Sequence, residues 1–386
     1  MSTGEGPAST RFSGLLIYGV RFVTARDVAR QCLSYSAGRG YESGQRGRMK
    51  SQLLSRLRGS IAPRRISSSA KRVFVVGAYL PNGGTYMAYH LGRILHLDFG
   101  LDVAAVVLGD ERLEKGIFDY DVKFPGISIA DMEQRIADDD ILLANPSFSN
   151  YFFGPRLPGR KLMYIQDFKT FALLDRDFNY YVCVSSFVAR FIRTTYGFGA
   201  PVIPAFIELC RLPTALAWRD RPAGSILVHL KGDPTFRSLV LARLREAVAH
   251  RAPRVDLDNI LDQPALPQAE FLARLGACRY LVSLSPAEGF GLVPLEAMAL
   301  GTTVIGFDAF GGREYMRPGK NCLVTSYPDI EGVAERLVAA LCAPAFAERL
   351  AGAGRSTASQ FGYQRFRAAW HDQFRRFLAA DGACRT

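Results

Sequence analysis

The stretch of residues 285–301, which reads SPAEGFGLVPLEAMALG, constrains the fold of this chain more than any other. It follows residues 280–284, a short apolar run with an aromatic and a β-branched residue, which is typical of a buried strand. A glycine-rich turn comes next, and Pro294 with the strong helix formers after it predicts a helix that begins at Pro294 and ends before Gly301. The turn therefore lies at the carboxyl end of a strand, where open α/β sheets bind their ligands.

The same stretch predicts an anion-binding site. The backbone N–H groups of residues 289–293 have no helical partner at such a helix start, and unpaired N–H groups there attract anions. Two carboxylates lie eight residues apart, Glu288 in the turn and Glu296 in the expected first turn of the helix. A site with these N–H groups and carboxylates fits a diphosphate together with the hydroxyls of a sugar or a ribose.

A purely structural explanation accounts for only one of the two glutamates. A carboxylate in a first helical turn is stabilised by the helix dipole whatever the function, and this explanation is open for Glu296. It does not apply to Glu288, which lies inside a glycine turn at the end of a strand. We therefore expect the pair to bind a ligand.

The charge of the chain is concentrated at its beginning. Residues 1–72 hold 12 Arg and 2 Lys against three acidic residues, a net charge of +11 out of the total of +12. The rest of the 386-residue chain holds 34 basic and 33 acidic residues. A length of this order suggests two domains. Because the basic and acidic residues after position 72 nearly balance, we expect no nucleic acid among the partners of the folded body.

The cysteines and histidines predict neither disulfides nor metal. Seven cysteines are scattered without a C-x-x-C pair, and five histidines are equally dispersed. This pattern indicates a reducing compartment. No apolar run approaches the ~20 residues of a transmembrane helix. We therefore expect a cytoplasmic protein.

The basic segment 1–71 is expected to be a disordered tail or an anchor. Its arginines favour peripheral contact of residues 1–70 with anionic lipid at the inner face of the membrane, since each basic residue near such a surface contributes ~1 kcal/mol. Two alternatives are open. The segment could be transit-like, or a true start at Met49 would leave residues 1–48 outside the protein.

After this segment, apolar runs that predict strands alternate with helical stretches, which indicates a parallel α/β fold. The predicted strands cover residues 72–77, 103–107, 141–144, 161–165, 181–184 and 225–229. The predicted helices cover residues 86–97, 129–138, 188–196, 237–250 and 270–276. The first helix follows a glycine loop at 82–85, and the proline-containing residues 201–222 suit a linker between two such series.

Residues 285–301 resemble the nucleotide-sugar-binding motif of retaining glycosyltransferases of family four (glycosyl transferases group one), written E-G-F-G-L-x-x-x-E-A-M-A with a glycine after it. The likeness continues through G-T-T-V-I-G at 301–306, G-G-R-E-Y at 311–315 and N-C-L-V at 321–324. It covers residues 272–341 closely, is weaker from Arg72 onward and does not include residues 1–71.

For the fold, the resemblance implies the GT-B architecture, an α/β class with two Rossmann-like domains facing a cleft. The N-terminal domain, on the acceptor side, would be 72–204. The domain that binds the nucleotide sugar would be 222–357. A C-terminal helix, 358–380, would cross back to the first domain.

For the activity, the resemblance implies transfer of a sugar, with retention of configuration, from a nucleotide diphosphate sugar to an acceptor hydroxyl. The acceptor would be a glycan or a lipid-linked molecule, in cell-surface polysaccharide or glycolipid synthesis, and no metal or other cofactor would be required. Glu288 would bind hydroxyls of the donor sugar, and Glu296 would accept hydrogen bonds from the ribose. Backbone amides of Phe290, Gly291 and Leu292 would lie beside the sugar and the phosphates.

Three further residues complete the predicted site. Lys231, just after strand 225–229, would meet the charge that develops on the leaving diphosphate; a solvated loop lysine is the alternative. Gly83 and Gly84 would let the backbone approach the donor phosphates or the reacting carbon, unless they only form a tight turn. Glu314 is expected only to shape the second glycine loop.

Two departures from the family pattern keep other functions open. The arginine that accompanies the lysine is replaced by Leu230 or displaced to Arg237, and the histidine of the cleft is replaced by Gln166 or Asp167. The alternatives are a catalytically idle GT-B-fold protein that binds a glycan or a partner, and a nucleotide-sugar epimerase. A dinucleotide oxidoreductase is disfavoured, because no G-x-G-x-x-G follows the first strand.

Overall fold

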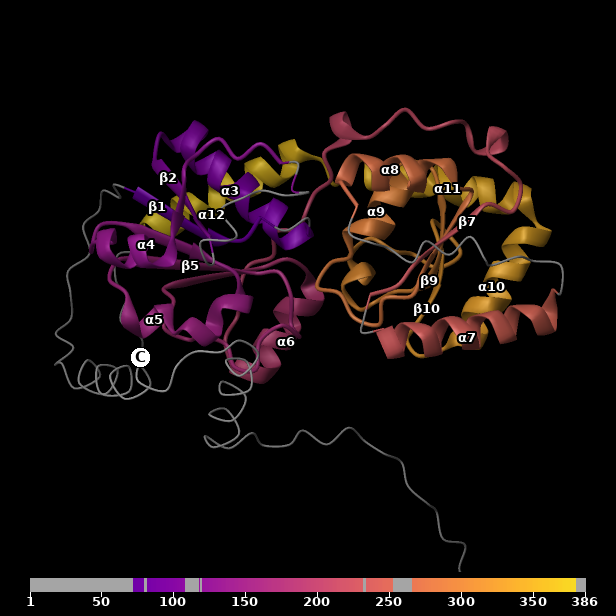
Figure 1. The fold of residues 1–386 in the computed structure, drawn as a ribbon, viewed down its shortest axis with the longest axis horizontal. Helices are drawn as coiled ribbons and strands as arrows, with labels where there is room; N and C mark the ends of the chain where they lie inside the picture. The colour runs from indigo at the N-terminus through magenta and orange to yellow at the C-terminus, as the bar shows by residue number, and fades with distance from the viewer. Residues whose placement is uncertain are drawn as a thin grey trace, which may run out of the picture. The chain divides into compact units, whose positions relative to one another are not determined.

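The computed structural model describes residues 72–79, 82–107, 118, 120–231, 234–252 and 266–379. These residues belong to one compact unit, Arg64–Thr386. They form two parallel sheets with their helices, as Figure 1 shows, and so have the predicted α/β class. The predictions for the basic segment 1–71, for its contact with lipid and for a start at Met49 lie outside the described residues.

The first sheet has six parallel strands in the order β3-β2-β1-β4-β5-β6. They are β1 (Arg72–Gly77), β2 (Asp102–Val107), β3 (Gly126–Ser128), β4 (Ile141–Ala144), β5 (Arg160–Ile165) and β6 (Tyr180–Cys183). The central strands β1, β4 and β5 are buried along nearly their whole length, as continuous apolar strands are when both faces of a sheet are covered. The three-residue β3 was not predicted, because its sequence, GIS, contains no apolar run.

The first half of the molecule, as we call this sheet and its helices, contains four α-helices and one 3-10 helix among its described residues. They are α3 (Gly83–Phe99), α4 (Ile129–Arg135), η2 (Pro146–Tyr151), α5 (Phe153–Arg156) and α6 (Ser186–Tyr196). Helix α3 begins three residues earlier than predicted, because the Asn82 side chain accepts a hydrogen bond from the Thr85 N–H at 3.0 Å and caps the helix there. Gly83 and Gly84 therefore lie in its first turn and not in a loop.

The second half contains a four-stranded parallel sheet in the order β10-β9-β8-β7. Its strands are β7 (Ile226–His229), β8 (Tyr280–Ser283), β9 (Thr303–Phe307) and β10 (Leu323–Thr325). Its helices are α7 (Pro234–Arg251), α8 (Gln268–Ala277), α9 (Leu292–Ala299), α10 (Ile330–Cys342) and α11 (Pro344–Ala358), with the 3-10 helix η5 (Gly311–Glu314). The described chain between the sheets carries the short 3-10 helices η3 (Leu209–Arg211) and η4 (Trp218–Asp220).

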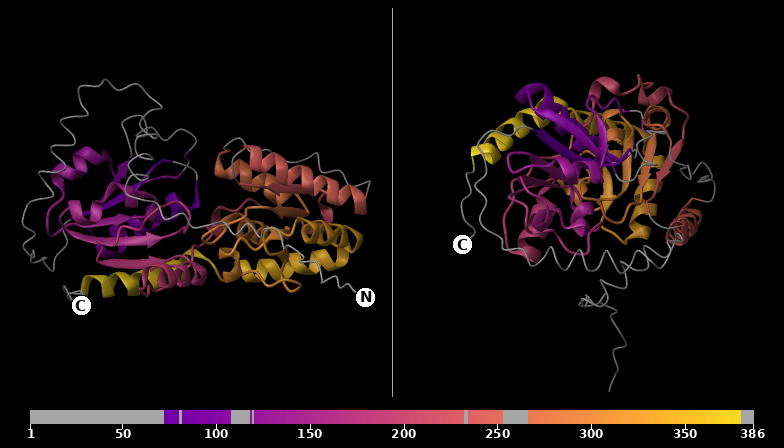
Figure 2. Two further views of the ribbon diagram at one scale, coloured as in Figure 1. Left: turned by 90° about the horizontal axis from the view of Figure 1, so that it is seen from below. Right: turned by 60° about the vertical axis from the view of Figure 1, so that its left-hand side comes forward.

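The last described helix, α12 (Tyr363–Ala379), returns to the first half, as predicted, and its yellow ribbon runs along that half in Figure 2. Phe366, Trp370, Phe374 and Phe377 recur every three or four residues and are all buried. The Trp370 ring lies 5.0 Å from that of Tyr164 on β5, centroid to centroid. The core of the first half is therefore completed by the end of the chain.

Candidate functional site

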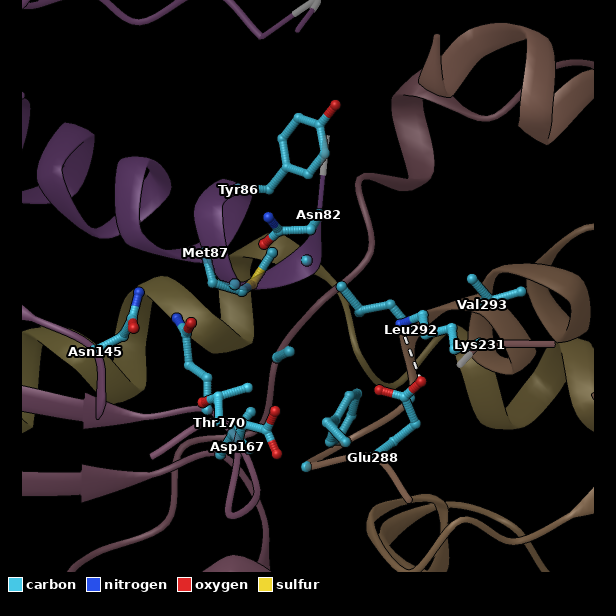
Figure 3. Close-up of a pocket in the computed structure, with 18 of the residues that line it drawn as sticks. Asn82, Tyr86, Met87, Asn145, Asp167, Thr170, Lys231, Glu288, Leu292 and Val293 are labelled. Atoms are coloured by element: carbon cyan, nitrogen blue, oxygen red, sulfur yellow. Dashed lines mark ion pairs between the residues drawn. The ribbon is translucent and has the colours of Figure 1, made fainter. Parts of the chain in front are cut away.

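A cavity of about 520 Å³ lies where the carboxyl ends of strands from both sheets come together, the place where parallel α/β sheets bind ligands. Figure 3 shows residues of the first half, such as Asp167, facing residues of the second half, such as Glu288, across it. All eight residues predicted for the site line this cavity. They are Gly83, Gly84, Lys231, Glu288, Phe290, Gly291, Leu292 and Glu296.

The glycine turn ends at a helix that starts earlier than predicted. Helix α9 begins at Leu292, with Gly291 as its N-cap in the left-handed region (φ +85°), and not at Pro294. Pro294 is tolerated as the third helical residue, because the first N–H groups of a helix have no partner in any case. Gly301, with φ +70°, ends the helix as predicted. Among the described residues, none accepts a hydrogen bond from the N–H groups of residues 289–293.

Glu296 consequently lies in the second turn of α9, which corrects its predicted place in the first. The helix dipole acts within the first turn and does not explain a carboxylate at this position. Glu296 is only 8% exposed, and burial raises its pKa to about 7, against the lowering effects of a hydrogen bond with Gln268 and of the Lys231 charge. Burial of a carboxyl group disfavours its charged form, and a carboxyl group with such a raised pKa in the wall of a cavity points to a ligand site.

Glu288 and Lys231 form an ion pair inside the cavity, with 2.9 Å between Glu288 Oε1 and Lys231 Nζ. The Glu288 side chain is 17% exposed and that of Lys231 is 54% exposed. Burial opposes ionisation of Glu288, but Lys231, together with Lys169 and His229, holds its pKa below the ordinary value. Glu288 is therefore an ionised carboxylate, and the lysine is held beside it and not freely solvated.

The two halves touch at Gly289, where no side chain fits. A Cβ atom there would lie 2.0 Å from the carbonyl oxygen of Gln166, which follows β5. The Ser185 hydroxyl, just before α6, also donates to the Gly289 carbonyl at 2.6 Å. At the other side of the cavity, a Cβ atom on Gly83 would lie 2.5 Å from Leu292 Cδ1. Glycine at these two positions allows the two halves to approach closely.

Glu314 does more than shape its loop. Its Oε2 accepts a hydrogen bond from the Ser186 N–H at 2.8 Å and so caps α6 of the other half. Leu230, one of the two positions considered for an arginine, packs against the apolar cluster of the second half. Arg237, the other position, lies in α7, and it is not among the described residues that line the cavity.

Several polar residues of the cavity were not predicted from the sequence. Those from the first half include Asn82, Asn145, Lys169 and Thr170, and those from the second half are His229 and Gln268. Gln166 and Asp167, which were considered only as replacements for a histidine, also line it. Asp167 Oδ1 accepts hydrogen bonds from the N–H groups of Phe168 (2.6 Å) and Lys169 (3.1 Å), while burial raises the pKa of this carboxyl group. Asn145 and Gln166 directly follow a strand, and Asp167 comes next in the chain; this is the signal that could have revealed these three.

No group of three or more His, Cys, Asp or Glu side chains in the described part of the chain could hold a metal ion. None of the helices that the structure describes is long and apolar enough to cross a membrane.

Comparison with known proteins places this geometry in context. Residues 258–357 match the family model of Glycosyl transferases group 1, so the predicted resemblance to that group is confirmed over this stretch. No curated protein sequence matches the chain.

Solved structures match nearly the whole described fold. A sucrose-phosphate synthase from Thermosynechococcus elongatus is 16% identical, with a TM-score of 0.60, and the match covers 80% of this chain and 100% of that one. HepE from Anabaena, in complex with UDP and glucose, is 15% identical, with a TM-score of 0.62 and coverage of 81% and 100%. A glycosyltransferase from Rickettsia africae is 14% identical, with a TM-score of 0.61 and coverage of 81% and 99%. These likenesses show the GT-B fold with its two Rossmann-like domains.

Proposed function

We propose that this chain is a glycosyltransferase that moves a sugar from a nucleotide diphosphate sugar to an acceptor hydroxyl, with retention of configuration. The observation that carries the proposal is the second-half wall of the cavity. There the unpaired N–H groups of residues 289–293, the Lys231–Glu288 ion pair and the buried Glu296 face one space. The family match over residues 258–357 includes residues 289–293, Glu288 and Glu296, while Lys231 lies outside it.

Each part of this wall suits one part of the donor. The diphosphate would bind the N–H groups of residues 289–293 at the start of α9, where backbone donors are free to bind an anion. Lys231 would add a positive charge beside it. Glu288, held as a carboxylate, would accept hydrogen bonds from hydroxyls of the sugar. Glu296 would accept hydrogen bonds from the ribose, since a carboxyl oxygen is an acceptor in either protonation state.

In the transfer step, the bond between the anomeric carbon and the diphosphate oxygen breaks, the bond to the acceptor oxygen forms, and the proton of the acceptor hydroxyl passes to the departing diphosphate. Negative charge grows on the departing diphosphate. Donors fixed in place before the reaction stabilise that charge without reorganising, and this is the main catalytic contribution assigned to Lys231 and the α9 amides. Retention is tested by the anomeric configuration of the product, which proton NMR of the newly formed linkage reports.

The acceptor would bind against the first half of the cavity and would be a glycan or a lipid-linked molecule of cell-surface polysaccharide or glycolipid synthesis. Residues 1–70 would hold the protein at the inner face of the membrane. Sedimentation with vesicles of anionic lipid tests this contact, which deletion of residues 1–70 should abolish. Unchanged sedimentation of the shortened chain would disprove it.

The first experiment is a thermal-shift screen of UDP, GDP, ADP and dTDP with the wild type and Glu296→Ala. A ligand at 100 times its Kd should stabilise the fold by about 2.7 kcal/mol, and this shift should be lost in the variant. UDP is the first candidate because HepE of similar fold was solved with UDP and glucose. The nucleotide sugar of the selected base then enters a transfer assay. Absence of any shift with a folded wild type would contradict the proposal.

One observation favours a second candidate, a catalytically idle protein that binds a glycan or a partner. Neither Leu230 nor Arg237 supplies an arginine to the cavity, so the diphosphate would meet less positive charge than the family pattern provides. Binding of a nucleotide without turnover of any nucleotide sugar would favour this candidate over the transferase.

A further inference from the structure

Two residues of the cavity carry buried polar atoms without a partner. In the described part of the chain, six buried side-chain nitrogen or oxygen atoms have no hydrogen-bond partner, and His229 Nδ1 and Gln166 Nε2 are the two on residues that line the cavity. Leaving such an atom unpaired is costly, so each one calls for an explanation. For Gln166 Nε2, a ligand in the cavity would provide it; for His229, the unpaired Nδ1 bears on which ring nitrogen carries the proton.

His229 is held firmly in place. It is the last residue of β7, its carbonyl accepts a hydrogen bond from the Leu284 N–H at 2.8 Å, and it pairs in register with Ser283 of β8. The whole residue is only 4% exposed. His229 nevertheless lines the cavity, and no described residue forms a hydrogen bond with its Nδ1. The sequence gives it no evident role, because no metal-binding or catalytic pattern surrounds it.

The surroundings determine the charge of this ring. Burial, and then the Lys231 charge, lower the pKa of His229 to about 4, although Glu288 acts in the opposite direction. The imidazole is therefore neutral at neutral pH and carries a single N–H. Nδ1 is enclosed and has no acceptor in reach, and an enclosed N–H without an acceptor is rare in proteins. The proton is thus assigned to Nε2, the nitrogen through which the ring can offer a donor to the cavity.

The neighbours of His229 indicate which part of a donor it would meet. Lys231 follows His229 by two residues, and the charges of Lys231 and Glu288 act on the His229 ring. On the proposed function, Glu288 binds the sugar and Glu296 the ribose, so His229 lies toward the sugar end of the diphosphate. Lys231 is already paired with Glu288, which leaves room for another donor to the phosphate oxygens.

We propose that His229 binds the distal phosphate of the donor through Nε2–H, as an uncharged hydrogen-bond donor beside Lys231. The inference rests on the proposed function and adds one specific contact to it. It gives the cavity a donor in the region where neither Leu230 nor Arg237 supplies a cation. The neutral Nε2–H group can donate a hydrogen bond to a phosphate oxygen. It would hold the released diphosphate less strongly than a second positively charged side chain would.

Three substitutions test the contact and the assigned nitrogen. In His229→Gln the amide nitrogen falls near the position of Nε2, in His229→Asn it falls near that of Nδ1, and His229→Leu has no donor. Binding is measured by calorimetry with matched pairs of nucleotides that differ by the distal phosphate: UDP with UMP, GDP with GMP, and ADP with AMP. Thermal unfolding without ligand shows whether each variant is folded.

We expect His229→Leu and His229→Asn to weaken binding of the diphosphate about 10- to 100-fold, the range for one hydrogen bond to a charged group. Binding of the monophosphate should change less than about 3-fold, and His229→Gln should retain most of the affinity for the diphosphate. This difference within each pair separates a phosphate contact from a merely structural role, which would weaken both nucleotides alike.

Other results would overturn the inference. Equal losses for diphosphate and monophosphate would make His229 a structural residue, and retention by His229→Asn with loss in His229→Gln would make Nδ1 the donor. Unchanged diphosphate binding in all three folded variants would remove His229 from the site and leave the proposed function intact. A folded wild type that binds none of the diphosphates would overturn both.

Discussion

The two walls of the cavity are built in different ways. The second-half wall takes most of its groups from one continuous stretch, Glu288 to Glu296, to which Lys231 is added by an ion pair. The first-half wall is assembled from residues that follow four different strands, among them Asn82 after β1, Asn145 after β4 and Gln166 after β5. The second-half wall carries an ion pair, a buried carboxyl group and the N–H donors of residues 289–293, whereas the first-half wall combines amide, hydroxyl and glycine residues with Asp167 and Lys169.

This difference suggests a division of labour. A wall of fixed N–H donors and an ion pair suits the invariant part of a reaction, which here is the proposed nucleotide diphosphate. Amide and hydroxyl side chains on separate loops can be exchanged one at a time without disturbing a helix start. We therefore expect substitutions in the second-half wall to affect donor binding and those in the first-half wall to affect the acceptor.

The largest effect should come from Glu288→Gln. The substitution removes a carboxylate that pairs with Lys231 at 2.9 Å and that would hold the donor sugar, so we expect the transfer rate to fall about 10²-fold or more. The rate is measured at saturating nucleotide sugar. Glu270→Gln on the surface of α8 is the matched control and should change the rate less than about 2-fold. A Glu288→Gln rate near that of the wild type would remove Glu288 from the site.

The second effect concerns the pH dependence of stability through Glu296. Its pKa is raised to about 7 in the folded chain, so the folded state binds more protons than the unfolded state between its ordinary pKa and about 7, and stability falls as pH rises through this window. The loss should reach about 3 kcal/mol at pH 8 and be absent at pH 4. Urea unfolding of the wild type and Glu296→Gln from pH 4 to pH 8 measures it. Parallel curves for the two proteins would contradict a buried carboxyl with a raised pKa.

The contact between the walls gives the third prediction. In Gly289→Ala the new Cβ would collide with the Gln166 carbonyl at 2.0 Å, so the halves must shift, at an expected cost of about 1–3 kcal/mol in the free energy of unfolding. Gly199→Ala, which meets no atom within 4 Å, is the control and should be close to neutral. Urea unfolding of both variants makes the comparison. Equal stabilities would show that the halves are not held in contact at Gly289.

The smallest effect should come from Asp167→Asn in the first-half wall. The variant keeps an oxygen that can accept hydrogen bonds from the Phe168 and Lys169 N–H groups, so the turn should be retained. We expect the KM for the acceptor to rise about 10-fold, the value of one hydrogen bond, while the Kd of the nucleotide stays unchanged. A change in nucleotide affinity larger than that in acceptor KM would contradict the division between the two walls.

The same comparison explains what could be predicted from the sequence. Most of the second-half wall lies in one segment, and its spacing of glycines and carboxylates was enough to name five of its residues. The start of α9 was misplaced by two residues, because Gly291 can adopt the left-handed conformation that caps the helix and Pro294 is tolerated anywhere in the first turn. Because α9 starts at Leu292, Glu296 lies in its second turn and not in the predicted first turn.

The first-half wall could be predicted only in part, because its residues are brought together by strand order. Asn82 and Asn145 are 63 positions apart in the chain. Both line the cavity because the strands before them, β1 and β4, are neighbours in the sheet. A pattern within one segment carries no information about that pairing. Gly83 and Gly84 were recognised, but their place in a helix depends on the cap that Asn82 provides.

The return of α12 to the first half has a consequence for how the protein is made. The first sheet is synthesised early, yet the Trp370 and Phe377 side chains that complete its core come after the whole second half in the chain. During synthesis this sheet must wait, with part of its apolar surface uncovered, until the whole second half has been translated. The half that is made first therefore completes its core only after the second half has been made, and its uncovered strands are open to aggregation until then.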